Sequence, residues 1–173
     1  KTGAVGMMRM LGVALTASVT AQYHPPRKAL GGGHPTHQAV AEPLSAQLGQ
    51  SVELQLVTSQ STSIGMYEQL ATVIDGHPVH GWNVKFTTYD NGRRVAVIPT
   101  APFTAPPTWS TNANNATRAM VVSDSTLASE VRWIWYEQSF QLGRWEMRKT
   151  EQGTAEWLWL RDELIHTRDL STH

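Results

Sequence analysis

The stretch VRWIWYEQSFQLGRWEMRKTEQGTAEWLWL, residues 131–160, is the densest apolar segment of this 173-residue chain and holds five of its seven tryptophans. Because no other segment offers as much area for burial per residue, we expect the fold to be built around it. Aromatic and β-branched residues favour a strand at its start. We predict a turn at Gly143 and a return strand over 144–150, which makes 131–150 a hairpin. A helix over 124–142 that ends at Gly143 is the alternative.

The end of this stretch predicts a C-terminal helix. Thr154 follows Gly153 and is a suitable N-cap residue. Apolar residues then recur at helical spacing, beside charged neighbours. They are Trp157, Leu160 and Leu164. We therefore predict a helix over 155–169.

Residues 82–98, WNVKFTTYDNGRRVAVI, predict a β-hairpin. Two alternating runs flank Asp90, Asn91 and Gly92. An Asn-Gly pair accepts the positive φ angles of a type I′ turn, whose twist matches that of paired strands. We expect Trp82, Val84 and Phe86 to share one face of the first strand; Val95 and Val97 should share one face of the second.

The region before this hairpin gives weaker patterns. Residues 22–37 are rich in Pro and Gly, which indicates a linker. We predict that a short helix follows over 42–48, with Gly49 as its C-terminal cap. Alternation over 51–58 predicts a strand. Residues 62–74 fit a helical stripe, although their Thr-Val-Ile end favours a strand, and we predict a helix.

Two segments have the features of docking segments. The apolar run within 5–21 resembles a signal peptide from Met7 onward but fits a helix docked on a partner as well. The Pro- and Asn-rich loop 99–115 is long enough to be functional or docked on another surface. The residues predicted to bind a partner are Met7, Met8, Leu11, Tyr23, Phe103 and Trp109.

Composition limits the classes of function. Fourteen basic residues balance fourteen acidic ones, so the zero net charge provides no general attraction to nucleic acid or to an acidic membrane. There is no cysteine, which excludes disulfides, thiolate metal sites and cysteine nucleophiles. Five basic residues lie near aromatic residues: Arg93, Arg94, Arg144, Arg148 and Lys149. They could form a local patch that binds single-stranded nucleic acid. We expect them instead to line the core or to pair with Glu137, Glu146 and Glu151.

Two short segments share the pattern G-H-P-x-H and are the only candidates for a metal site. They supply His34 and His37, and His77 and His80. Four imidazoles could bind Zn²⁺ or Cu²⁺, but neither segment has the spacing or the adjacent Glu of a catalytic metal site. Solvated His-Pro turns explain them more simply. The chain contains no nucleophile elbow, no phosphate-binding loop and no dinucleotide-binding motif, so we predict no enzyme and no cofactor.

These features together predict an α+β fold: an antiparallel β-sheet with a C-terminal helix and an extended N-terminal arm, or, as the alternative, an all-β barrel or sandwich. We expect residues 1–50 to form an N-terminal helix and docking arm, and residues 51–173 to form a single domain. The expected function is a non-catalytic structural or accessory subunit of a large protein assembly, with other subunits as partners and peripheral membrane contact possible. The absent initiator Met suggests a mitochondrial complex. The alternatives are a virion structural protein or a small-ligand-binding β-barrel module.

Overall fold

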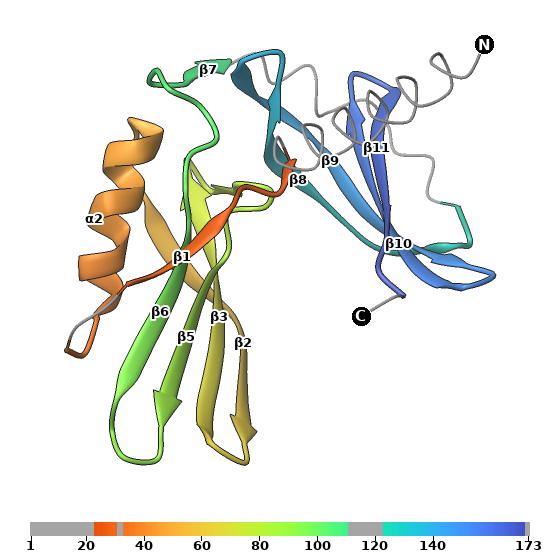
Figure 1. Ribbon diagram of the computed structural model, residues 1–173. Helices are drawn as coiled ribbons and strands as arrows, with labels where there is room; N and C mark the ends of the chain where they lie inside the picture. Colours follow the sequence, from red (N-terminus) through yellow and green to blue (C-terminus); the bar gives the residue numbers. More distant parts are fainter. Residues whose placement is uncertain (1–22, 31–32, 111–122, 172–173) are drawn as a thin grey trace, which may run out of the picture. The chain divides into compact units, whose positions relative to one another are not determined.

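The chain is mostly β-structure in the computed structural model, which describes residues 23–30, 33–110 and 123–171 (Figure 1). Strands make up 59% and helix 10%, arranged as two sheets and one helix with no closed barrel among these residues. The predicted α+β class is therefore wrong. The described chain divides into two compact units, which differ from the predicted division at residue 50. The first contains the described residues up to Ile74 and His80–Pro106; the second contains Asp75–Val79 and the described residues from Pro107 onward.

The first unit is an antiparallel sheet with one helix packed against it. The strand order is β1-β6-β5-β3-β2. The strands are β1 (Arg27–Leu30), β2 (Glu53–Thr62), β3 (Gly65–Ile74), β5 (Val84–Tyr89) and β6 (Arg94–Pro99). The helix α2 (His37–Leu48) buries Val40, Leu44 and Leu48 and contacts β2 and β6 (Figure 1). The core of this unit therefore lies between the helix and the sheet.

The predicted hairpin over 82–98 is confirmed as β5 and β6. Gly92 has a φ of 82°, but Asn91 is not among the residues with positive φ, so the turn is not the predicted type I′. The Gly92 N–H donates to the Tyr89 carbonyl at 2.9 Å across this turn. Trp82, Val84 and Phe86 are all buried, with at most 1% of their surface exposed. These side chains supply much of the apolar area that holds this unit together.

The predicted helix over 62–74 is wrong, because this segment forms the strand β3. β3 pairs with β2 on one side and with β5 on the other, and its last five residues, Leu70–Ile74, are all buried. A strand with both faces covered has a continuous apolar run, which also matches a helical stripe. The segment forms a strand because it pairs with β2 and β5, which the sequence pattern alone does not reveal.

The predicted N-terminal arm is part of the first unit wherever it is described. Strand β1 pairs with β6, and the predicted helix over 42–48 is α2, which begins earlier, at His37. Thr36 caps α2 by accepting a hydrogen bond from the backbone N–H of Ala39 at 3.1 Å. Gly49 caps its other end at a φ of 65°, as predicted. An extended arm is thus wrong for these residues, and residues 1–22 lie outside the described part.

The second unit is a sheet centred on its longest strand, β9. Its sheet is formed by β7 (Thr108–Ser110), β8 (Thr126–Tyr136), β9 (Ser139–Thr150), β10 (Gly153–Leu160) and β11 (Glu163–Asp169). The two-residue strand β4 (His77–Pro78) belongs to the first sheet, where it pairs with β3. The order is β11-β10-β9-β7, and β8 pairs with β9 along nearly its full length. β7 runs parallel to the first residues of β9, whereas β10 runs antiparallel to the later ones.

The predicted hairpin over 131–150 is confirmed as β8 and β9, but its turn lies elsewhere. The turn residues are Glu137 and Gln138, both with positive φ (49° and 63°), as a type I′ turn requires. Gly143 lies within β9 instead. A Cβ atom there would be 2.5 Å from the Trp159 carbonyl oxygen and 2.6 Å from a methyl carbon of Ile134. Gly143 therefore permits a close approach within the sheet and does not end a strand.

The predicted C-terminal helix over 155–169 is wrong, because β10 and β11 form an antiparallel hairpin there. Arg161 and Asp162 form its turn, with φ angles of 60° and 107°. Residues along β10 alternate strictly between two faces, so Trp157 and Trp159 lie on one face and Leu158 on the other. The helical spacing of three apolar residues was coincidental.

Candidate functional site on the second sheet

One face of the second sheet gathers arginine, glutamate and tryptophan side chains from two strands. In the register of β9 and β10, Glu146 is opposite Trp157 and Arg144 is opposite Trp159. Residues opposite each other lie on the same face of the sheet. Arg148 lies on this face as well, because it is two positions from Glu146 along β9. We call these five residues the arginine–tryptophan cluster.

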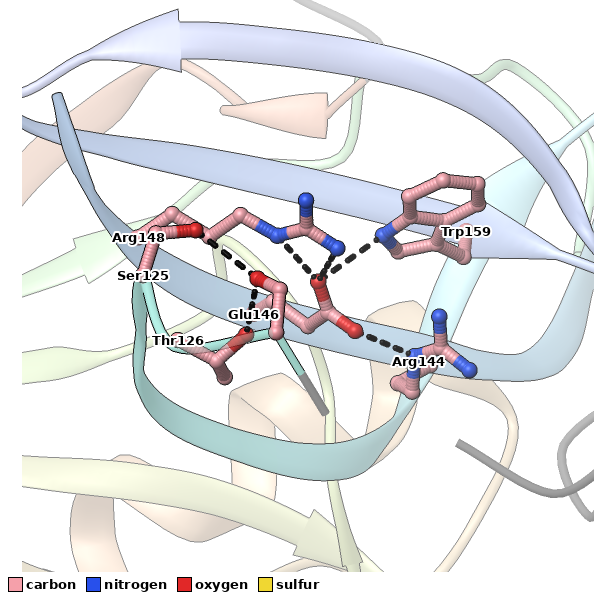
Figure 2. A network of polar contacts seen from close by, with 7 residues as sticks. Ser125, Thr126, Arg144, Glu146, Arg148 and Trp159 are labelled. Carbon is pink, nitrogen blue, oxygen red and sulfur yellow. Dashed lines mark hydrogen bonds and ion pairs between the residues drawn. The ribbon is translucent and has the colours of Figure 1, made fainter. Parts of the chain in front are cut away.

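The carboxylate of Glu146 is the centre of this cluster and is completely buried. The Nε atom of Arg144 lies 2.7 Å from its Oε1 atom, and the Nε and Nη2 atoms of Arg148 each lie 2.7 Å from Oε2. The indole N–H of Trp159 donates to Oε2 at 3.2 Å. Figure 2 shows the carboxylate between these three side chains. Oε2 accepts from Arg148 and Trp159, whereas the contact of Arg144 with Oε1 is an ion pair without hydrogen-bond geometry. Because this carboxylate is completely buried, it is out of reach of a substrate.

The two arginines also stack on the tryptophans. The guanidinium carbon of Arg148 lies 4.0 Å from the ring centroid of Trp157, and that of Arg144 lies 5.2 Å from that of Trp159. Both arginine side chains are mostly buried, at 15% and 13% exposure. Each such contact contributes about 0.5–2 kcal/mol, more when water is excluded. The orientation of Trp157 is therefore fixed from one side by Arg148.

The opposite face of the same strands carries a similar arrangement. The indole N–H of Trp145 donates to Glu156 at 3.0 Å, and the Nε atom of Arg168 lies 3.7 Å from the same carboxylate. The guanidinium of Arg132 stacks on Trp145 at 3.9 Å. Burial lowers the pKa of Arg132, and the neighbouring carboxylate of Glu130 opposes this effect. Both faces thus use a buried glutamate that binds an indole and arginine.

An open groove of about 440 Å³ lies beside the arginine–tryptophan cluster, with Trp157 belonging to both. Its lining comes from the ends of β9, β10 and β11 and the turn between the first two. The lining residues are Thr150, Glu151, Gln152, Ala155, Trp157, Thr167, Arg168 and Asp169. The backbone N–H and the hydroxyl of Ser171 lower the pKa of Asp169, so this carboxylate is ionised at neutral pH. The volume is in the range of small-molecule sites.

The residues predicted to bind a partner pack within their own unit where they are described. Three of them, Met7, Met8 and Leu11, lie outside the described residues. Tyr23 is buried, with 4% of its surface exposed. Phe103 stacks on Trp82, with 6.2 Å between ring centroids, and Trp109 stacks on Phe140 at 4.2 Å. Phe103 and Trp109 keep part of their surface exposed, so a role in binding stays a prediction for them.

The predicted metal ligands of the first unit contact different neighbours. His37 lies against Phe86 and 3.3 Å from Arg94, whereas the ring of the buried His80 lies 5.0 Å from that of His24. His34 is exposed. His77, in the second unit, contacts the edge of Trp133. In the part of the chain that the structure describes, no group of three potential ligands close enough to hold a metal ion includes any of the four predicted histidines.

The sequence contained a signal for the cluster that the helix prediction concealed. The expected pairing of Arg144 and Arg148 with Glu146 is confirmed. The alternation R-x-E-x-R over 144–148, followed by the Trp-x-Trp pair at 157–159, places all five side chains on one face once both segments are strands. The groove itself had no signal, because it depends on how three strand ends lie together.

Comparison with known proteins gives no relative: no family model, curated protein or solved structure matches the chain. Among the described residues, no helix is long and apolar enough to cross a membrane.

Proposed function

We propose that this protein is a non-catalytic binding module, and that the groove beside Trp157 binds a small, uncharged ligand rich in hydroxyl groups, such as a mono- or disaccharide. The supporting observation is the composition of the groove, in which one indole wall is combined with hydroxyl, amide and carboxylate groups and one guanidinium group. Small-molecule sites combine an apolar surface with a few polar groups that fix the orientation of the ligand.

The groove chemistry favours this class over anionic ligands. A sugar ring has a face of C–H groups that packs on an aromatic ring, while its hydroxyls donate to oxygen acceptors. Trp157 supplies the ring, and the carboxylates of Glu151 and Asp169 supply acceptors. The two carboxylates outnumber the single guanidinium of Arg168 in the lining, so the net charge of the groove disfavours an anionic ligand.

The arginine–tryptophan cluster supports the groove by holding Trp157 in place. The Arg148 guanidinium covers one side of the Trp157 ring and is itself held by the buried Glu146. A side chain that is already ordered loses little conformational entropy when a ligand binds. This explains why a buried ionic network lies directly beside a solvent-accessible groove.

Calorimetry and backbone NMR with a panel of neutral mono- and disaccharides test this function. We expect shifts confined to the groove residues. Trp157→Ala should weaken binding at least about tenfold, a loss of about 1.4 kcal/mol, whereas Trp157→Phe should keep part of the affinity because it keeps an aromatic face.

Lys149→Ala is the matched control, because Lys149 is exposed, lies on the same hairpin and does not line the groove. It should leave both affinity and fold unchanged. Putrescine and inorganic phosphate serve as charged comparison ligands. Preferential binding of either one, or sugar binding that survives Trp157→Ala in a folded protein, would contradict the proposal.

A structural or accessory subunit of a larger assembly, including a virion protein, is the second candidate. It is favoured by large apolar side chains that are exposed in the described chain. They are Leu56, Val57, Ile64, Met66, Leu127 and Leu164. Exposed apolar patches mark protein–protein contacts when they are contiguous. The native mass of the purified protein together with its co-purifying chains tests this candidate.

A further inference from the structure

The outermost strand of the first sheet has an open edge. β2 is last in the order β1-β6-β5-β3-β2, so its pairing in the described sheet is with β3 alone. All but one of its ten residues are exposed, from Glu53 to Thr62. The outer edge of such a strand presents backbone N–H and C=O groups that can pair with another chain.

β2 has few of the features by which proteins protect an open edge. Its sequence, ELQLVTSQST, contains no Lys, no Arg and no Pro, and its single charge is Glu53 at one end. An irregularity between Leu56 and Thr58 interrupts its register with β3. From Thr58 to Thr62 the pairing is regular. An uncharged, regular and exposed edge is suited to pairing with another strand.

The regular part of β2 is complementary to itself. Residues 58–62 read Thr-Ser-Gln-Ser-Thr, the same in both directions. If two copies pair antiparallel about a two-fold axis at Gln60, Thr58 of one copy faces Thr62 of the other, and Ser59 faces Ser61. Pairs of threonine or serine across strands are favourable, and no like charges face each other.

The residues that flank this segment extend the complementarity. Leu56 and Val57 precede it and are 58% and 60% exposed, while Ile64 follows it and is 56% exposed. Antiparallel pairing about Gln60 brings the Leu56 end of each copy to the Ile64 end of the other. Pairing would thereby remove large apolar side chains from contact with water at both ends of the shared edge.

We propose that this edge binds a second copy of the chain: two β2 strands pair antiparallel about a two-fold axis at Gln60 and join two first-unit sheets into one continuous sheet. The interface is isologous, because each copy uses the same residues. The proposal is independent of the ligand groove, which lies on the second sheet.

Single cysteine substitutions test the register cleanly, because the chain has no cysteine of its own. Directly opposite Cα atoms in antiparallel strands are about 4.5–5.5 Å apart, within the range that a disulfide bridges. Gln60→Cys should therefore give a covalent dimer under mild oxidation. Ser59→Cys and Ser61→Cys should cross-link faster when mixed than either does alone. Asp90→Cys, in the exposed turn between β5 and β6, is the control and should stay monomeric.

Gln60→Lys provides the complementary test, since it places two like charges directly opposite each other. Sedimentation equilibrium should show a dimer for the unmodified chain and at least a tenfold weaker dimer for Gln60→Lys, with unchanged circular dichroism. Thr104→Lys adds the same charge at an exposed loop position and should leave the dimer intact. A monomeric unmodified chain, a dimer that survives Gln60→Lys, or Ser61→Cys that cross-links alone as fast as the mixture would overturn the proposal.

Discussion

Glu146 is the residue on which most polar contacts of the arginine–tryptophan cluster depend. Its buried carboxylate holds the side chains of Arg144, Arg148 and Trp159 at once. A buried charge is tolerated only when its partners compensate for the loss of water. The two arginines depend on the Glu146 carboxylate in the same way. Removing Glu146 would leave two mostly buried guanidinium groups on one face without their shared counter-ion.

Glu146→Ala should therefore destabilise the protein by about 3–5 kcal/mol, the usual effect of breaking a buried ion pair from one side. Glu146→Gln should cost less, because its amide oxygen still accepts from Trp159. Urea denaturation measures both. The triple variant Arg144→Met, Glu146→Leu, Arg148→Met should recover much of the loss, since no buried charge remains. A loss below about 1 kcal/mol for Glu146→Ala would show that the network contributes little.

At the scale of elements, the open end of the β10–β11 hairpin is fastened by Ser171. Its hydroxyl accepts from the Thr154 N–H at 2.8 Å and donates to the Thr154 carbonyl at 3.2 Å. Its backbone N–H donates to the Asp169 carboxylate at 2.8 Å. The last described residues thus return to the first residues of β10. This contact also places the Asp169 carboxylate at the groove.

The pKa of Asp169 should lie below its ordinary value of 3.8, chiefly because of the Ser171 backbone N–H and secondly because of its hydroxyl. The folded state then binds the Asp169 proton more weakly than the unfolded state. The contribution of the Asp169–Ser171 contact to stability is therefore present above the unfolded pKa and is lost as the pH falls through the folded pKa. NMR titration of the Asp169 carboxyl measures the shift.

Two variants at Ser171 separate the causes of that shift. Ser171→Ala keeps the backbone N–H and should retain most of the lowered pKa, whereas Ser171→Pro has no N–H and should return the pKa close to its ordinary value. Asp169→Asn is the control that removes the titration. Equal shifts in the two Ser171 variants would show that the backbone bond is not the main cause.

Elements with strong local signals were predictable, and those decided by long-range pairing were not. The position of the turn in 82–98 and the caps of α2 follow from local backbone preferences, although the predicted type I′ geometry does not hold at Asn91. Residues 62–74 and 155–169 match a helical stripe and a strand equally well, because a buried strand next to a turn can imitate helical spacing. Gly143 resembles a turn residue in the sequence. The need for glycine there becomes clear only from the structure, in which a Cβ atom would lie too close to the Trp159 carbonyl oxygen. The cluster could be predicted from alternation once β9 and β10 were assigned as strands, but not before.

At the scale of the whole molecule, each unit has its own core. The first buries Leu44 of α2, Phe86 of β5 and Trp82, which precedes β5. The second buries Ile134 of β8 and Leu158 of β10. The units differ in how they are stabilised. The first relies on a helix over an apolar sheet face. The second has a buried ion-pair network on one face of its sheet and, on the other face, the buried Glu156, which accepts from the Trp145 indole.

Separate cores predict that a cavity in one unit lowers the stability of that unit first. Leu44→Ala and Leu158→Ala each truncate a side chain with no exposed surface and should cost about 2–5 kcal/mol. Hydrogen exchange followed by mass spectrometry separates the units, because peptides from β5–β6 and from β9–β10 report on different sheets. Leu44→Ala should accelerate exchange in β5–β6, and Leu158→Ala should do so in β9–β10. Loss of protection in both peptides with either variant would mean that the two cores unfold as one cooperative unit.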